Sequence, residues 1–133
     1  MLRFLEKRKK LLVYFPLVVY WLILLTATSI PAANMPSIEM IDKVNHLVAY
    51  FGLSVLLFLT FLFQRKYKLS LIKISLYPII ICAIYGALDE IHQMFIPGRS
   101  AEFLDWLADF GGATLAVALM VYIVHLSKYE INK

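Results

Sequence analysis

Residues 103–126 form the longest of four apolar stretches in the chain, FLDWLADFGGATLAVALMVYIVHL. About 20 residues of α-helix cross the roughly 30 Å hydrocarbon layer of a bilayer, because each residue adds about 1.5 Å. This stretch is therefore predicted to span a membrane. Three further apolar runs cover Leu11–Ile30, Val44–Phe63 and Leu71–Leu88. We expect an all-α polytopic membrane protein, a single domain over 1–133 built as a bundle of four transmembrane helices, with spans at about 11–30, 44–63, 71–90 and 103–126.

The composition excludes most other classes of protein. Hydrophobic residues make up 62% of the 133 residues and charged residues 17%, against about half and about a quarter in a soluble domain. Strands of a membrane barrel would alternate polar and apolar residues, which these runs do not. A secretory signal is an alternative for the first run, but the apolar part of a signal is only about 7–15 residues long, so we favour a retained span. Pro16 and Pro78 lie inside spans and are expected to kink or loosen them.

Basic residues are strongly segregated by this four-span arrangement. The side that holds both termini has eleven of the thirteen Lys and Arg residues: Arg3, Lys7, Arg8, Lys9, Lys10, Arg65, Lys66, Lys68, Lys73, Lys128 and Lys133. The opposite side keeps Lys43 and Arg99. Because Lys and Arg accumulate in cytoplasmic loops, both termini are predicted to be cytoplasmic. Topology and contact with anionic lipid explain the basic clusters, so no nucleic-acid partner is expected.

Acidic residues show the reverse distribution. The outer side, or the outer half of a span, holds Glu39, Asp42, Asp89, Glu90, Glu102, Asp105 and Asp109, together with His46 and His92. If the last helix begins near Ser100, Asp109 lies about 13 Å along it, inside the hydrocarbon. A carboxylate there costs about 2.5–3.5 kcal/mol unless it faces a protein or water-filled interior. We therefore expect Asp109 to face inward.

Helical spacing places the polar residues on shared faces. The stripes are Asp105, Asp109, Gly112 and Ala116 on the last helix, Cys82, Tyr85, Asp89 and Gln93 on the third beside Gly86 and Glu90, and Asp42, His46 and Tyr50 on the second. Between the last two helices, residues 95–100 read FIPGRS, which predicts a tight Pro-Gly turn that holds Arg99 near the carboxylates. Ser100 suits an N-cap of the last helix. Together these features predict an outward-facing polar pocket.

Three polar blocks of the sequence resemble the VanZ-like family. They are DKVNHLVAYFGL at 42–53, DEIHQMFIPGR at 89–99, and Asp105 with DFGG at 109–112, so the resemblance covers about residues 42–115. Asp109 departs from the family pattern, which favours Asn before the paired small residues. The resemblance implies a small four-helix integral protein of the bacterial cytoplasmic membrane. The founding member of that family is associated with resistance to the lipoglycopeptide teicoplanin.

The residues leave three interpretations of the pocket open. In the first, an enzyme acts on the headgroup of a phospholipid or a lipid-linked cell-wall precursor: carboxylates with histidines serve as general acid and base or bind a divalent cation, and Lys43 and Arg99 hold a phosphate. In the second, the pocket binds a lipid headgroup or a lipoglycopeptide without catalysis. In the third, the carboxylates pair with basic residues only to lock the bundle.

These interpretations share one set of candidate residues. The predicted catalytic residues are His46, Asp89, Glu90, Asp105 and Asp109, and the predicted binding residues are Lys43, Gln93 and Arg99. Asp42 is either a further site residue or the N-cap of the second helix, and His92 is expected to face headgroups. The expected partners are membrane lipids or lipid-linked cell-wall precursors. The sequence identifies no cofactor, no particular metal and no oligomeric state.

Overall fold

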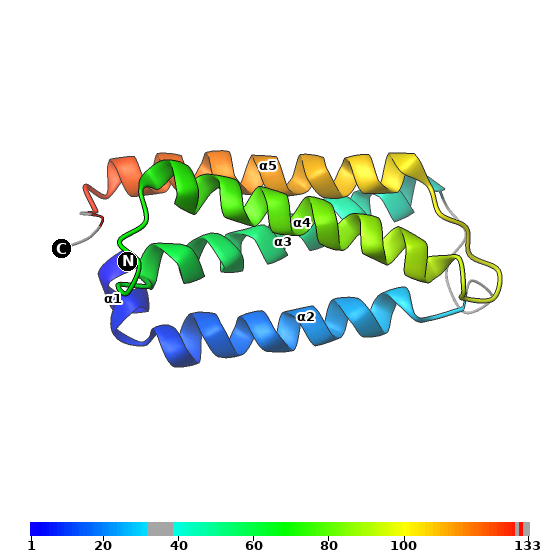
Figure 1. Cartoon of the computed structure of the whole chain (residues 1–133), viewed down its shortest axis with the longest axis horizontal. Helices are drawn as coiled ribbons and strands as arrows, with labels where there is room; N and C mark the ends of the chain where they lie inside the picture. Colours follow the sequence, from blue (N-terminus) through cyan, green and yellow to red (C-terminus); the bar gives the residue numbers. More distant parts are fainter. Residues whose placement is uncertain (32–38, 130, 132–133) are drawn as a thin grey trace.

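The computed structural model describes residues 1–31, 39–129 and 131, and this part of the chain contains helices and no strand (Figure 1). A short helix, α1 (Leu2–Lys7), precedes a π-helical turn, η1 (Lys10–Tyr14), which continues into α2 (Phe15–Thr28). Three long helices follow: α3 (Glu39–Phe63), α4 (Leu71–Gln93) and α5 (Phe103–Leu126). The all-α prediction is confirmed.

Four segments of the described residues are long and apolar enough to cross a membrane. They are Lys10–Thr28, Asp42–Phe63, Leu71–Gln93 and Phe103–Leu126, which confirms the prediction of four helices able to span a membrane. Helices α3 and α4 extend beyond their apolar runs at the same end of the bundle, because polar side chains there, such as Asp89 and Gln93, are buried between helices instead of ending them. Asp42 lies inside α3, so its interpretation as an N-cap is wrong.

Helices α3 and α5 pack closely because small residues line their contact. A Cβ atom added at Gly112 of α5 would lie 2.1 Å from the backbone oxygen of Leu47 on α3. This is a steric clash, so the close approach of the two helices requires glycine at this position. Ala113 and Ala116 are fully buried at the same contact, and the Ser54 hydroxyl donates a hydrogen bond to the Ala113 carbonyl at 3.0 Å. Close approach of this kind is the usual way in which helices pack within lipid.

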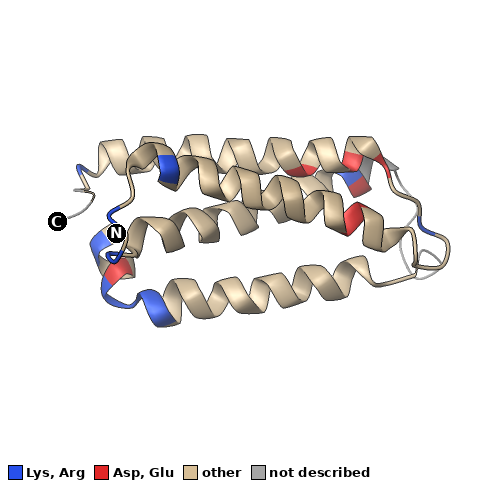
Figure 2. Ribbon diagram, viewed as in Figure 1, with Lys and Arg blue, Asp and Glu red and all other residues tan. Residues whose placement is uncertain are grey.

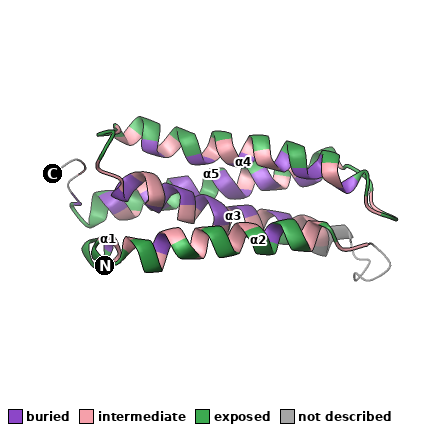
Figure 3. Ribbon diagram, turned by 60° about the horizontal axis from the view of Figure 1, so that its bottom comes forward, coloured by how far each residue is buried: buried purple, intermediate pink, exposed green. Residues whose placement is uncertain are grey.

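Helix α2 lies at the periphery, beside α3 and α4 and away from α5 (Figures 1 and 3). Leu24 is its buried residue, whereas Val18, Leu22 and Leu25 are exposed. In a membrane protein such exposed apolar faces meet lipid tails.

The two prolines inside spans have different surroundings. Pro16 stands at the start of α2, directly after η1, and the wide turn of η1 agrees with the loosening expected where a backbone N–H is missing. Helix α4 continues without interruption through Pro78, which is buried.

The two ends of the bundle differ in charge (Figure 2). We call the end with α1, the start of α4 and the end of α5 the basic end. The acidic end is the opposite one, where α3 and α5 begin and α4 ends. Acidic residues gather at the acidic end, as the segregation of charge in the sequence predicts (Figure 2). Lys43 lies there beside Glu102 and Asp105, and Arg99 lies there beside Asp89.

A polar cluster closes the basic end. Arg65 donates hydrogen bonds to Glu6, from Nε to Oε1 at 2.9 Å and also from Nη2, and to the Tyr129 hydroxyl at 3.1 Å. Burial raises the pKa of Glu6, but hydrogen bonds with Tyr129 and Arg65 and the charge of Arg65 outweigh it, so this pKa lies below its usual range. The Lys9 ammonium donates to the Phe63 carbonyl at 2.6 Å. These contacts tie the N-terminal segment to the ends of α3 and α5.

Candidate functional site

A histidine–carboxylate pair is buried between α3 and α5 near the acidic end. His46 Nδ1 lies 2.9 Å from Asp109 Oδ1, and the two residues are 7% and 0% exposed. Asp109 shares a helix face with Gly112, three residues further on, whose close approach to α3 brings the carboxylate to the histidine. The prediction that Asp109 faces the interior is confirmed.

Glu90 joins α4 to the beginning of α5. Its Oε2 accepts a hydrogen bond at 2.6 Å from the backbone N–H of Glu102, the N-cap residue of α5, where the helix dipole favours a negative charge. The predicted N-cap, Ser100, lies two residues earlier and is exposed. That prediction is wrong because the capping oxygen comes from another helix and not from a local hydroxyl. The other oxygen of Glu90, Oε1, is buried without a hydrogen-bond partner among the described residues.

Lys43 is held by acidic residues at the start of α5. Its Nζ lies 3.0 Å from Glu102 Oε2 and 3.3 Å from Asp105 Oδ1. Asp105 is buried, whereas Lys43 is half-buried. In this arrangement the ammonium group neutralises carboxylates, and its predicted contact with a phosphate stays a prediction.

Asp89 and Gln93 lie one turn apart on the buried face of α4. Gln93 Nε2 is 3.5 Å from Asp89 Oδ2, at the long limit of a hydrogen bond. The Trp106 indole of α5 donates to the Ala83 carbonyl of α4 at 2.9 Å and fixes the two helices against each other. His92 is half-buried, and its Nε2 lies 3.1 Å from the hydroxyl of Ser29, the C-cap residue of α2.

A cavity of about 230 Å³ lies at the acidic end, lined by residues of α2, α3 and α4 and by Arg99. Its polar lining consists of Thr28, Asp42, Asn45, His46, Tyr50, Asp89 and Arg99. The Arg99 Nη1 and the Tyr50 hydroxyl are buried, and neither has a hydrogen-bond partner within the described residues. Two donors of this kind suit a ligand that carries oxygen acceptors.

The turn that carries Arg99 has the predicted form. The Arg99 N–H donates to the Ile96 carbonyl at 3.1 Å, and Gly98 has a φ of 77°. Proline followed by glycine with positive φ is typical of a type II turn. Pro97 and Gly98 therefore set the position from which Arg99 reaches the cavity.

The structure divides the predicted site residues into two sets. His46, Asp89 and Arg99 line the cavity, whereas Lys43, Glu90, Gln93, Asp105 and Asp109 belong to the surrounding contacts between helices. Thr28 and Asn45 were not among the predicted site residues, and Tyr50 was predicted only to share a helix face with Asp42 and His46. A signal existed for Asn45, which shares a helix face with Asp42 and Ala49, but none existed for Thr28 near the end of an apolar span.

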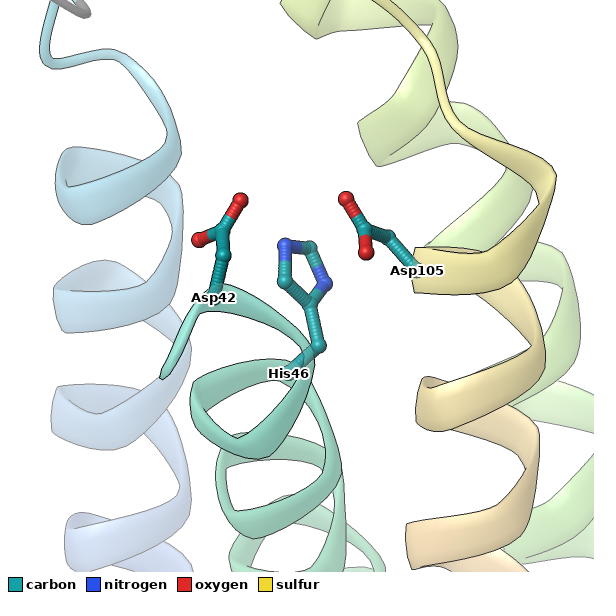
Figure 4. A group of neighbouring side chains, drawn as sticks. All are labelled: Asp42, His46 and Asp105. Atoms are coloured by element: carbon teal, nitrogen blue, oxygen red, sulfur yellow. The ribbon is translucent and has the colours of Figure 1, made fainter. Parts of the chain in front are cut away.

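Two groups of side chains at the acidic end have the spacing of metal ligands. They are Asp42, His46 and Asp105, and His46, Glu90 and Asp109; in each group one ligand atom from every residue lies within 4.8 Å of the others. Figure 4 shows that the carboxylates of Asp42 and Asp105 flank the His46 ring, with one ring nitrogen facing the space between them. Imidazole nitrogen with carboxylate oxygens suits Zn²⁺ or Mn²⁺.

Comparison with known proteins gives a family. A family model described as VanZ/LLP1 matches residues 3–125 of the chain. No curated protein and no solved structure shows significant similarity to it.

Proposed function

The chain belongs to the VanZ/LLP1 family, as its three polar blocks predict, and from this premise we propose that it binds and processes the headgroup of a membrane lipid or lipid-linked envelope precursor. It is a multi-pass membrane protein. The proposal places it in the bacterial cytoplasmic membrane with both termini in the cytoplasm and the acidic end outside. The segregation of Lys and Arg to the basic end supports this orientation.

One observation carries the proposal: the cavity at the acidic end combines unpartnered donors with a carboxylate and a histidine. Arg99 and Tyr50 supply the donors, and Asp89 and His46 supply groups that exchange protons. At about 230 Å³ the cavity is smaller than the roughly 300–1,000 Å³ of pockets for drug-sized ligands. Its size favours a phosphate headgroup over an entire lipoglycopeptide.

Each residue around the cavity has a separate role in the proposed reaction. The Arg99 guanidinium holds the phosphate through two parallel hydrogen bonds. When Asp109 accepts a hydrogen bond from Nδ1–H of His46, the other ring nitrogen carries a lone pair and takes a proton from a water or a hydroxyl group. The deprotonated oxygen bonds to phosphorus as the bond from phosphorus to the leaving oxygen breaks, and Asp89 at the cavity wall, in its protonated form, gives its proton to that leaving oxygen. Glu90 and Asp105 hold α5 and Lys43 in place around this centre.

A role in teicoplanin resistance is part of the proposal, through a change in lipid-linked precursors. Expression in a susceptible bacterium should lower susceptibility to teicoplanin, and His46→Ala and Arg99→Lys should abolish the effect at equal membrane levels. An unchanged susceptibility on expression of the wild type would remove this part of the proposal and leave the headgroup activity to be judged separately.

The headgroup activity is tested with purified protein in lipid nanodiscs. Labelled phospholipids and polyprenyl phosphates are supplied separately, and both turnover and saturable binding are measured for the wild type, Arg99→Lys and His46→Ala. We expect turnover of one headgroup class, lost in His46→Ala, and binding at least about tenfold weaker in Arg99→Lys, since lysine cannot reproduce a two-point contact. The matched control is Arg65→Lys at the basic end, which should retain both.

Binding without turnover would favour a non-catalytic binding protein with the same cavity. If the wild type neither bound nor converted any headgroup, the proposed function would be wrong.

A further inference from the structure

We propose that His46, Glu90 and Asp109 bind one divalent metal ion, of the Zn²⁺ or Mn²⁺ class, inside the acidic end of the bundle. The three residues come from α3, α4 and α5, so one ion would link the three most closely packed helices. This inference does not depend on the proposed lipid substrate, because all three protein ligands belong to this chain. In the metal-bound form the lone pair of the His46 ring binds the ion, so the proton-accepting role proposed for His46 applies to the metal-free form.

The first argument is the pair of unpartnered carboxylate oxygens. Glu90 Oε1 and Asp109 Oδ2 are both buried with no hydrogen-bond partner in the described part of the chain, and their residues are 6% and 0% exposed. A buried carboxylate oxygen without a partner costs free energy, so such atoms in native proteins have a partner, which is often a water or an ion.

The unpartnered oxygen of Asp109 points toward α4. A Cβ atom added at Gly86 would lie 2.8 Å from Asp109 Oδ2, and Glu90 is one turn beyond Gly86 on the same helix. The free oxygens of the two carboxylates therefore belong to facing surfaces of α4 and α5. Glycine at position 86 leaves the room that the carboxylate occupies.

The negative charge of Glu90 and Asp109 also favours a bound cation. Among the described residues, the ion pairs of the acidic end join Lys43 to Glu102 and Asp105, and His46 to Asp109. No basic side chain in this set pairs with Glu90. A divalent cation would neutralise Glu90 and Asp109 together, which a single imidazolium cannot do.

The geometry permits one ion. The three ligand atoms lie within 4.8 Å of one another. Two ligands at about 2.0–2.2 Å from one tetrahedral ion lie about 3.3–3.6 Å apart, so side-chain rotations that move the ligand atoms by up to about 1.5 Å relative to one another complete the site.

A path for the ion is also present. Asp42 is half-buried and Asp105 is buried, and their carboxylates flank the same histidine ring (Figure 4). These two carboxylates attract a cation from solution and pass it to His46. They form the approach, whereas Glu90 and Asp109 complete the site.

The test uses the full chain, stripped with chelator and then titrated with Zn²⁺ or Mn²⁺ in detergent. Elemental analysis gives the stoichiometry, and calorimetry gives the affinity. We expect about one ion per chain, at least about tenfold weaker binding in Glu90→Gln and Asp109→Asn, and a smaller loss in Asp42→Asn. The matched control, Glu102→Gln, changes a carboxylate at the same end that belongs to neither group and should bind like the wild type.

Weaker metal binding in a variant could reflect either a lost ligand or a misfolded protein. A variant that gains a spectroscopic signal on metal binding distinguishes the two. Asp109→Cys titrated with Co²⁺ should show a thiolate-to-metal absorption band that the wild type, whose only cysteine is the buried Cys82, does not show. The proposed site would be overturned if the folded wild type bound neither ion. It would also be overturned if Asp42→Asn abolished binding while Glu90→Gln and Asp109→Asn retained it. Infrared spectra of the wild type, with and without metal, test the alternative that Glu90 and Asp109 share a proton. A carboxylic-acid band that is present in both wild-type samples and lost in Glu90→Gln would identify this proton, and it would also overturn the proposed metal site.

Discussion

At the residue scale, Asp109 is fully buried and depends on His46 for its hydrogen bond, whereas His46 also borders the cavity. The Asp109 carboxylate therefore has no water to replace the bond if His46 is lost. We predict that Asp109→Ala lowers the free energy of unfolding by about 1–3 kcal/mol, the cost of leaving a buried polar group unpaired, and that Asp109→Asn loses less. Thermal unfolding in detergent measures both. Glu102→Ala, which removes a half-exposed ion pair, should cost at most about 1 kcal/mol; an equal loss in both alanine variants would contradict the argument.

Two tyrosine hydroxyls offer a contrast at the same scale. Tyr50 lines the cavity, and its hydroxyl has no partner among the described residues, whereas the Tyr20 hydroxyl donates to the Ala49 carbonyl at 3.0 Å. We predict that Tyr50→Phe leaves the stability unchanged but weakens headgroup binding in nanodiscs. Tyr20→Phe should lower the free energy of unfolding by about 1 kcal/mol and leave binding intact. A reversed pattern would mean that Tyr50 serves the fold and not the cavity.

At the scale of the helices, adjacent glycines of α5 have opposite roles. A Cβ at Gly112 would strike the backbone of α3 at Leu47, whereas nothing lies within 4 Å of a Cβ at Gly111. We predict that Gly112→Ala destabilises the bundle by about 1–3 kcal/mol, because backbone cannot move aside as a side chain can. Gly111→Ala should be neutral or stabilise α5 by up to about 1 kcal/mol. Unfolding midpoints of the two variants, compared side by side, check this; equal midpoints would mean that α3 and α5 are less closely packed.

The helices were predictable from the sequence because lipid imposes one rule on the whole span. Each apolar run had to be helical, and the bounds of α5 are the predicted ones. Asp109 could be placed inward because exposure to lipid would be costly. Ser100 failed as an N-cap because the competing oxygen belongs to Glu90, and only packing of α4 against α5 reveals it. Spacing along one helix likewise could not show that Lys43 forms ion pairs with Glu102 and Asp105, because these residues belong to another part of the chain.

At the scale of the whole molecule, the basic end is closed by Glu6, Arg65 and Tyr129. The pKa of Glu6 is lowered, so its ion pair stabilises the folded state above pH 4.5, the ordinary value, and this contribution is lost as the pH falls through the lower folded value. We predict that the wild type is more stable than Glu6→Gln by up to about 1 kcal/mol at pH 7, since the pair is partly exposed. Unfolding measured from pH 7 to pH 3 should show this difference shrink. A difference that grew on acidification would contradict the assignment.

The orientation in the membrane decides whether the cavity can meet an envelope precursor at all. Eleven basic residues on the side of the termini predict that the basic end stays in the cytoplasm, where Lys and Arg are retained, so the cavity beside Arg99 would open outward. Cysteines placed at two exposed positions report this: Ser100→Cys at the acidic end and Tyr67→Cys at the basic end, each against the buried Cys82. In intact bacteria a membrane-impermeant thiol reagent should label Ser100→Cys, and Tyr67→Cys only after permeabilisation. The opposite pattern would turn the cavity toward the cytoplasm, where its substrate would have to be a lipid of the inner leaflet.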